Sequence, residues 1–98
     1  MANFRQLISG SIPVLIYFFS ESYPLSKSSN TVMMSIAKEM AEQVRVLKIS
    51  LDKNPLLAGR MLMNKVPTVM IFKGETLFFR QSGIVHKAQI MKAFRVIN

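Results

Sequence analysis

The stretch from Val14 to Phe19 restricts the fold more than any other part of this sequence. All of its residues are hydrophobic, and most are β-branched or aromatic. A continuous hydrophobic run of this length is typical of a strand that is buried on both faces. Such a strand lies inside a sheet that helices cover on each side. The run therefore predicts an α/β domain with a central sheet.

Helical and strand-like patterns alternate along the rest of the chain. Between Leu25 and Met40, apolar or small residues recur at intervals of three and four, which predicts an amphipathic helix that begins at Pro24. The segment Val44–Leu51 has the alternation of a strand, but its phase slips near Leu47 and Lys48. The slip favours either a bulge or a strand that is partly buried on both faces.

The other predicted elements complete the order helix, strand, helix, strand, helix, hairpin, helix. They are a helix capped by Asn3 and ending at Ile8, a helix from Pro55 to Met63 capped by Asn54, strands Pro67–Phe72 and Thr76–Arg80 around the turn Lys73–Glu75, and a last helix marked by Ile90, Met91, Phe94 and Ile97. A strand–helix–strand unit pairs in parallel and a hairpin pairs antiparallel, so we expect a mixed sheet with helices on both faces. We expect the helical methionines to fill the core, namely Met33, Met34, Met40, Met61 and Met63.

The chain has 98 residues, half of them hydrophobic, which suits one compact domain over residues 1–98. It contains no cysteine, and this excludes disulfides, thiolate metal ligands and thiol nucleophiles. One histidine, His86, and five scattered acidic residues do not predict a metal site. We therefore expect neither a metal nor a cofactor, and we expect His86 to have a surface or capping role.

The net charge is +8, from 13 Lys and Arg against 5 Asp and Glu. Such a charge permits binding to nucleic acid, anionic lipid or an acidic protein. The basic residues are spread along the chain without a nucleic-acid motif, which favours a solvated basic surface and leaves nucleic acid as an alternative partner. No stretch reaches the ~18 apolar residues of a transmembrane helix. Gly10 and Pro13 interrupt the apolar start of the chain, so we expect a cytoplasmic protein, in an oligomeric state that the sequence leaves open.

Four local sequences follow one another at a characteristic spacing: Val14–Ser22, Lys48–Pro55, Val66–Thr68 and Ile71–Glu75. Together they resemble the thioredoxin family over nearly the whole chain. In that family they correspond to the central strand leading to the active site, a strand and the turn into the third helix, the segment of a cis-proline, and a hairpin turn. Gly83 stands where the family has a glycine beside its substrate groove. The resemblance implies a thioredoxin-like α/β fold, with a central mixed β-sheet flanked by helices on both faces.

The resemblance also implies that the catalytic groups of the family are replaced. Ser22 stands at the position of the family's tryptophan, and Tyr23 and Ser26 stand at its two cysteine positions. Tyr17 stands at the position of the buried aspartate that assists proton transfer. Dithiol exchange needs a thiolate, which neither a phenol nor a serine hydroxyl supplies. We therefore interpret the chain as a non-redox domain rather than an enzyme, with a residual thioredoxin-type oxidoreductase as the alternative.

A peptide-binding groove is the remaining implication of the resemblance. It would be formed by Ser22, Tyr23, Pro24, Val66, Pro67, Gly83 and Ile84. With Pro67 cis, the backbone of Val66 would bond to an extended peptide and Tyr23 would add an aromatic contact. The opposite interpretation is that Pro67 only shapes its loop and Tyr23 fills the space of the lost tryptophan. Our leading hypothesis is capture of a peptide or a partner protein, and the basic charge would suit an acidic one.

The start of the long helix, Tyr23–Lys27, offers a weaker hypothesis. The free backbone N–H groups of a helix N-terminus favour anions, and Ser26 and Lys27 could assist in binding one. No glycine-rich loop precedes the helix, so a phosphate site is the less supported interpretation.

Overall fold

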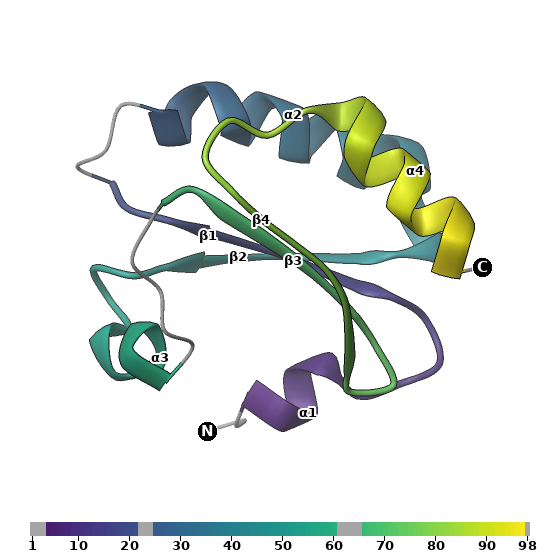
Figure 1. Ribbon diagram of the computed structural model, residues 1–98, viewed down its shortest axis with the longest axis horizontal. Coiled ribbons are helices and arrows are strands. Elements are labelled where there is room, and N and C mark those ends of the chain that lie inside the picture. Colours follow the sequence, from purple (N-terminus) through teal and green to yellow (C-terminus); the bar gives the residue numbers. More distant parts are fainter. Residues whose placement is uncertain (1–3, 22–24, 61–65, 98) are drawn as a thin grey trace.

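The computed structural model describes residues 4–21, 25–60 and 66–97, with the backbone alone for residues 25–28 and 58. Its elements are α1 (Phe4–Ile8), β1 (Val14–Phe19), α2 (Leu25–Met40), a 3-10 turn η1 (Ala41–Gln43), β2 (Arg45–Ser50), α3 (Pro55–Arg60), β3 (Thr68–Lys73), β4 (Thr76–Ser82) and α4 (Lys87–Ile97). The order of types matches the prediction, and Figure 1 shows the sheet between two layers of helices.

The sheet is mixed and has the strand order β2-β1-β3-β4. β1 pairs in parallel with β2 and antiparallel with β3, and Ile16 lies opposite both Leu47 and Met70. β1 is therefore an internal strand, as its unbroken hydrophobic run predicted. The α/β class and the thioredoxin-like fold expected from the sequence are confirmed.

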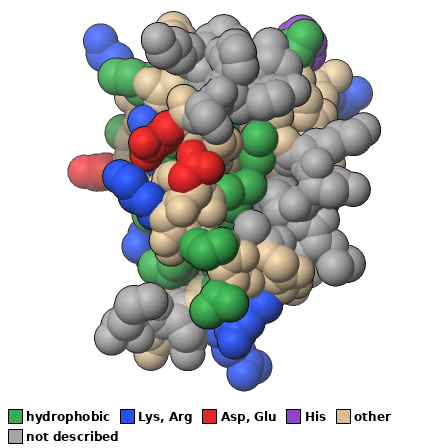
Figure 2. Space-filling view, turned by 90° about the vertical axis from the view of Figure 1, so that its left-hand side faces the viewer, with side chains coloured by type: hydrophobic (Ala, Val, Ile, Leu, Met, Phe, Trp, Pro, Cys, Tyr) green, Lys and Arg blue, Asp and Glu red, His purple; other side chains and the backbone are tan. Residues whose placement is uncertain are grey.

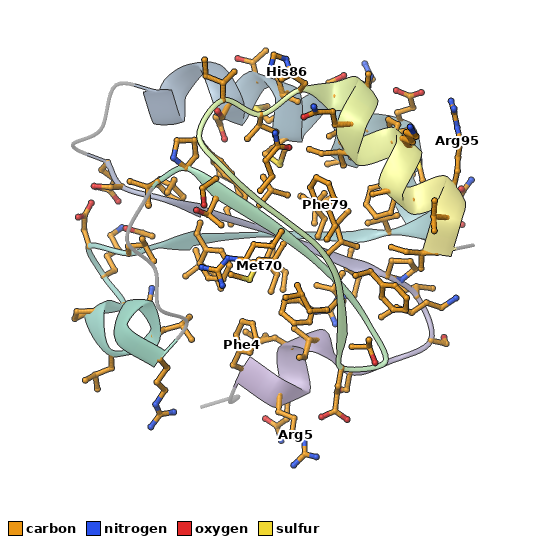
Figure 3. The ribbon with its side chains drawn as sticks, viewed as in Figure 1. Phe4, Arg5, Met70, Phe79, His86 and Arg95 are labelled. Atoms are coloured by element: carbon orange, nitrogen blue, oxygen red, sulfur yellow. The ribbon has the colours of Figure 1, made fainter. Side chains whose placement is uncertain are left out.

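Two hydrophobic clusters lie on opposite faces of the sheet. Successive strand residues point to opposite faces, so Leu15 and Tyr17 enter one cluster while Ile16 and Phe18 enter the other. Helices α2 and α4 cover the first face, and α1 and α3 cover the second (Figure 1). Figure 3 shows Phe79 on the side of α4 and Phe4 on the opposite side of the sheet.

β2 settles one of the alternatives that the sequence left open. Its pairing with β1 runs without a shift from Arg45 to Ser50. Val46 packs against the first cluster, while Leu47 and Ile49 pack against the second. The slip in the hydrophobic pattern therefore marks a strand that is partly buried on both faces, not a bulge.

A register shift does occur, but in the β3–β4 hairpin. Phe72 pairs with Leu77, whereas the residue before it in β3, Ile71, pairs with Phe79. Phe78 is the extra residue in β4 and has no partner in β3. β4 also extends to Ser82, beyond the predicted end at Arg80, because the shifted pairing continues along β3.

The exposure of Met34 contradicts the prediction that it fills the core. Its side chain is 62% exposed, whereas that of Met33 is buried and that of Met40 is partly buried. Consecutive helical residues are about 100° apart around the axis, so the core-facing stripe that includes Met33 and Ile36 excludes Met34. Met61 and Met63, the predicted end of the third helix and the cap Asn3 lie outside the described residues.

The turn between β3 and β4 is held by the first helix. Gly74 and Glu75 have φ values of +55° and +72°, the backbone of a tight hairpin turn. The backbone N–H of Glu75 donates to the carbonyl of Ile8 at 3.3 Å, and its carboxylate pairs with Arg5. The hydrogen bond to Glu75 raises the pKa of the Arg5 guanidinium, which is charged in any case.

None of the helices in the described part of the chain has the length and the apolar character of a membrane span.

Candidate functional site

The described part of the predicted groove is built where β3 begins and β4 ends. The Val66–Pro67 peptide bond is cis, and Pro67 is buried. The backbone N–H of Gly83 donates to the carbonyl oxygen of Pro67 at 2.8 Å. This bond holds the segment before β3 against the segment after β4. It thereby brings Val66, Pro67, Gly83 and Ile84 together from two parts of the sequence.

Ile84 presents its side chain at the surface of this site. It is 61% exposed, whereas the next residue, Val85, is buried in the core beneath α4. Gly83 has a φ of +92°, a conformation that residues with a side chain rarely adopt. The chain turns at Gly83, anchors itself through Val85 and leaves Ile84 facing solvent.

Two polar contacts that no sequence pattern predicts support this geometry. The hydroxyls of Thr68 and Ser82 are 2.8 Å apart and share a hydrogen bond. Thr68 follows Pro67 and Ser82 precedes Gly83, so this bond lies next to the bond between Gly83 and Pro67. Lys87 donates to the hydroxyl of Ser35 at 2.7 Å and pairs with Glu39, which ties the start of α4 to α2. No sequence motif indicates either pair, since both depend on the register of elements that are distant in the chain.

A third missed contact holds the end of β1. The carboxylate of Asp52 accepts hydrogen bonds from the Ser20 hydroxyl at 3.0 and 3.1 Å and from the backbone N–H of Glu21 at 2.8 Å. Glu21 in turn pairs with Lys53 at 3.4 Å. Figure 2 views this side of the molecule and shows acidic and basic side chains next to each other beside a band of hydrophobic ones. The acidic residues therefore serve to position the chain that leads to the groove.

Several predicted site residues lie outside the described structure. They are Ser22, Tyr23 and Pro24, and for Ser26 only the backbone is described. Among the described residues, no group of three or more His, Asp or Glu side chains could hold a metal ion. His86 is exposed, just before α4, and its backbone carbonyl accepts from the N–H groups of Gln89 and Ile90 at 3.2 and 3.4 Å. Figure 3 shows its side chain at the outer surface.

Comparison with known proteins identifies the family. The family model described as thioredoxin matches residues 1–95. The chain belongs to the thioredoxin family. The thioredoxin-like protein slr0233 of Synechocystis is 27% identical over 96 residues, covering 97% of this chain and 91% of that protein. Thioredoxin 1 of Synechococcus elongatus is 36% identical over 73 residues, covering 74% of this chain and 68% of that protein. A solved structure titled "Structure of a malarial protein" has a TM-score of 0.83 at 23% identity, covers 88% of this chain and 97% of that one, and supports the fold.

The chain lacks the reactive groups on which the thiol chemistry of its family depends. It contains no cysteine, so the active-site cysteines of the family are absent. At the position that the resemblance assigns to the family's buried acid, Tyr17 is fully buried. Its ring is stacked on that of Phe19, with centroids 5.6 Å apart and an interplanar angle of 11°. An aromatic pair therefore fills the interior where an acid would assist thiol chemistry.

Proposed function

We propose that this thioredoxin-family domain binds an extended peptide or a segment of a partner protein without redox chemistry. The observation that carries the proposal is the hydrogen bond from Gly83 to Pro67, which joins the segment of Val66 and Pro67 to the segment of Gly83 and Ile84. The absence of cysteine removes the thiolate on which dithiol exchange depends. Of the two activities that the resemblance implies for this site, dithiol exchange needs a thiol and peptide binding does not.

The chemistry of this surface suits an extended polypeptide. Ile84 supplies an exposed apolar side chain, and the half-buried Val66 directly precedes Pro67, which bonds to the neighbour of Ile84 in the chain, Gly83. Extended segments are recognised through main-chain hydrogen bonds together with contacts to alternate side chains. The partly buried Thr68–Ser82 bond holds the two backbone segments next to these residues together, so little ordering is required when a peptide binds.

Replacing Ile84 with aspartate is expected to weaken binding about tenfold, equivalent to ~1.4 kcal/mol, because a charge would replace the apolar contact. The probe is a fluorescein-labelled peptide selected on the parent protein from a phage-displayed random library, with affinity measured by fluorescence anisotropy. Ile84 is exposed, so the folded structure should persist, which far-UV circular dichroism would verify.

Val96→Asp is the matched control, since Val96 is an exposed apolar residue on α4 and the substitution adds the same charge. It should leave the affinity for the selected peptide unchanged. Parent-like binding by Ile84→Asp, or an equal loss with Val96→Asp, would show that the selected peptide does not use the Ile84 surface.

The protein is also expected to give no reduction of insulin disulfides above the rate of dithiothreitol alone. Neither a phenol nor a hydroxyl can attack a disulfide sulfur as a thiolate does. The measurement is the turbidity of precipitating insulin, with a cysteine-containing thioredoxin at the same concentration as the positive control. A rate that rises with the concentration of this protein would contradict the non-redox proposal.

A further inference from the structure

A second surface of the molecule is independent of the Pro67 site. A groove of about 530 Å³ lies between strand β4 and helix α4. Its strand side consists of the four consecutive residues 78–81, and its helix side includes Lys92 and Val96. Adjacent strand residues point to opposite faces, so a groove lined by four in succession follows the backbone edge of β4.

That backbone edge is open in the described structure. β4 is the outermost strand in the order β2-β1-β3-β4, so only one of its edges is paired with a described strand. The outer edge of such a strand presents N–H and C=O groups that a further extended segment can bond to. The groove therefore combines backbone hydrogen-bonding groups with the space for side chains.

Two of the side chains at the groove are apolar and exposed. Phe78 is 51% exposed and Val96 is 79% exposed, although both are large hydrophobic residues. Phe78 is the extra residue of the hairpin bulge, so it has no partner in β3. The bulge places Phe78 and the adjacent Phe79 along the same groove. Exposed apolar surface of this kind marks interaction sites when polar residues surround it.

The charged residues at the groove are all basic. Arg80 and Lys92 line it, and neither β4 nor α4 contains an Asp or a Glu. Lys92 has no ion-pair partner among the residues that the structure describes. With a net charge of +8 for the whole chain, the local field favours an anionic occupant.

We propose that the groove between β4 and α4 binds an extended acidic segment of a partner protein. In this arrangement the segment lies along the outer edge of β4 and inserts an apolar side chain between Phe78 and Val96. Carboxylates on the α4 side of the segment lie near Lys92, and carboxylates on the other face of the sheet lie near Arg80, which pairs with Met70. An acidic peptide satisfies all three features of the groove, whereas nucleic acid has no main chain that can extend a β-sheet.

The test uses two fluorescein-labelled peptides of equal length, one alternating valine with glutamate and the other alternating valine with lysine. Anisotropy titrations at low ionic strength should detect binding of the glutamate peptide alone, since surface charges are screened by salt. Lys92→Glu is expected to weaken that binding roughly fivefold or more, because an exposed attraction becomes a repulsion. Val96→Asp should weaken it by a similar factor.

Each variant has a matched control. Arg60→Glu makes the same charge change on α3, which covers the opposite face of the sheet, and Ile84→Asp adds the same charge at the Pro67 site. Both should retain the affinity of the parent within about twofold, a difference well below 1 kcal/mol. This pattern would support the proposal, provided that Val96→Asp leaves the affinity of the protein for a single-stranded thymidine oligonucleotide unchanged.

Three results would overturn it. The first is no binding of the glutamate peptide to the parent protein. The second is an equal loss with Lys92→Glu and Arg60→Glu, which would mean that only net charge matters. The third is an equal effect of Val96→Asp on peptide and oligonucleotide. Val96→Asp is the test variant for this groove and the control for the Pro67 site, and Ile84→Asp is the test variant for the Pro67 site and the control for this groove. Failure of the proposal for this groove is therefore distinguishable from failure of the proposal for the Pro67 site.

Discussion

Replacing Tyr17 with aspartate is expected to destabilise the fold by at least ~4 kcal/mol at neutral pH, the largest effect we predict. Tyr17 is fully buried, and every other buried member of its cluster is hydrophobic. The substitution removes the ring that stacks on Phe19 and leaves a carboxyl group in its place. Domains of this size are stable by roughly 5–15 kcal/mol, so the variant should be near the limit of folding.

The pH dependence separates the charge of the new carboxyl from the loss of the ring. Burial raises the pKa of a carboxyl group above its unfolded value of ~3.9. Below that value the group is neutral in both states and ionisation adds no penalty. As the pH rises, the unfolded state releases its proton first, so the folded state loses stability until its own raised pKa is reached.

Tyr17→Asn is the matched control, because it removes the same ring and adds a polar group that does not titrate. Urea denaturation followed by far-UV circular dichroism would give the free energy of unfolding of both variants at pH 4 and pH 7. The aspartate variant should be the less stable of the two at pH 7 and similar to the asparagine variant at pH 4. An equal difference at both pH values would mean that water reaches this position.

Phe94→Ala is the second large effect, with an expected loss of about 3–5 kcal/mol. Phe94 lies on α4 and is buried in the cluster that joins this helix to α2 and to the sheet. Removing its ring leaves a cavity that the surrounding side chains fill only in part. For a domain of this length, each kcal/mol lowers the melting temperature by roughly 4–8 °C, so a fall of more than ~10 °C is expected.

Val96→Ala on the same helix is the control for Phe94→Ala. Val96 is two residues further along and exposed, so its truncation should change the melting temperature by no more than about 2 °C, as for other surface positions. The measurement is thermal unfolding followed by circular dichroism. A similar fall for both variants would indicate that the helix as a whole, and not the packing of Phe94, limits stability.

Sequence and fold together explain why this domain cannot carry out the thiol chemistry of its family. Absence of cysteine alone excludes thiol chemistry in any fold. The fold adds that the position assigned to the family's buried acid holds an aromatic pair, Tyr17 and Phe19. Two acidic residues at the described part of the β1–α2 connection, Glu21 and Asp52, hold the chain in place. The domain therefore keeps the scaffold of the family without its reactive groups.

The internal strand was predictable because a strand that is buried on both faces has an unbroken run of hydrophobic residues in the sequence. Val14–Phe19 is hydrophobic at every position, and the observed β1 has these same bounds. The amphipathic helix was also predicted with its observed end at Met40, while its predicted first residue, Pro24, lies outside the described residues. The exposure of Met34 was not, because methionine is equally suited to fill a core or to lie on a surface, and only its angle around the helix decides between them.

The candidate site was predictable only in part. The resemblance to thioredoxin indicated Val66, Pro67, Gly83 and Ile84 as neighbours, and the bond from Gly83 to Pro67 does bring the two segments together. The pair of Thr68 and Ser82 behind them was missed. Regular pairing counted back from the hairpin turn would place Thr68 opposite Gln81. The bulge at Phe78 shifts the pairing by one residue, so that Thr68 lies opposite Ser82.

By itself, the sequence determined the fold class, the internal strand and the loss of thiol chemistry, because hydrophobic pattern and residue type decide these directly. Only the tertiary structure decided where the bulge lies, and with it the Thr68–Ser82 bond and the position of Phe78 along the edge of β4. Strand register depends on how both sheet faces pack against helices that are distant in the chain. That balance of packing energies has no local signature, so the groove between β4 and α4 became visible only in the folded molecule, whereas the residues of the Pro67 site were already indicated by the sequence.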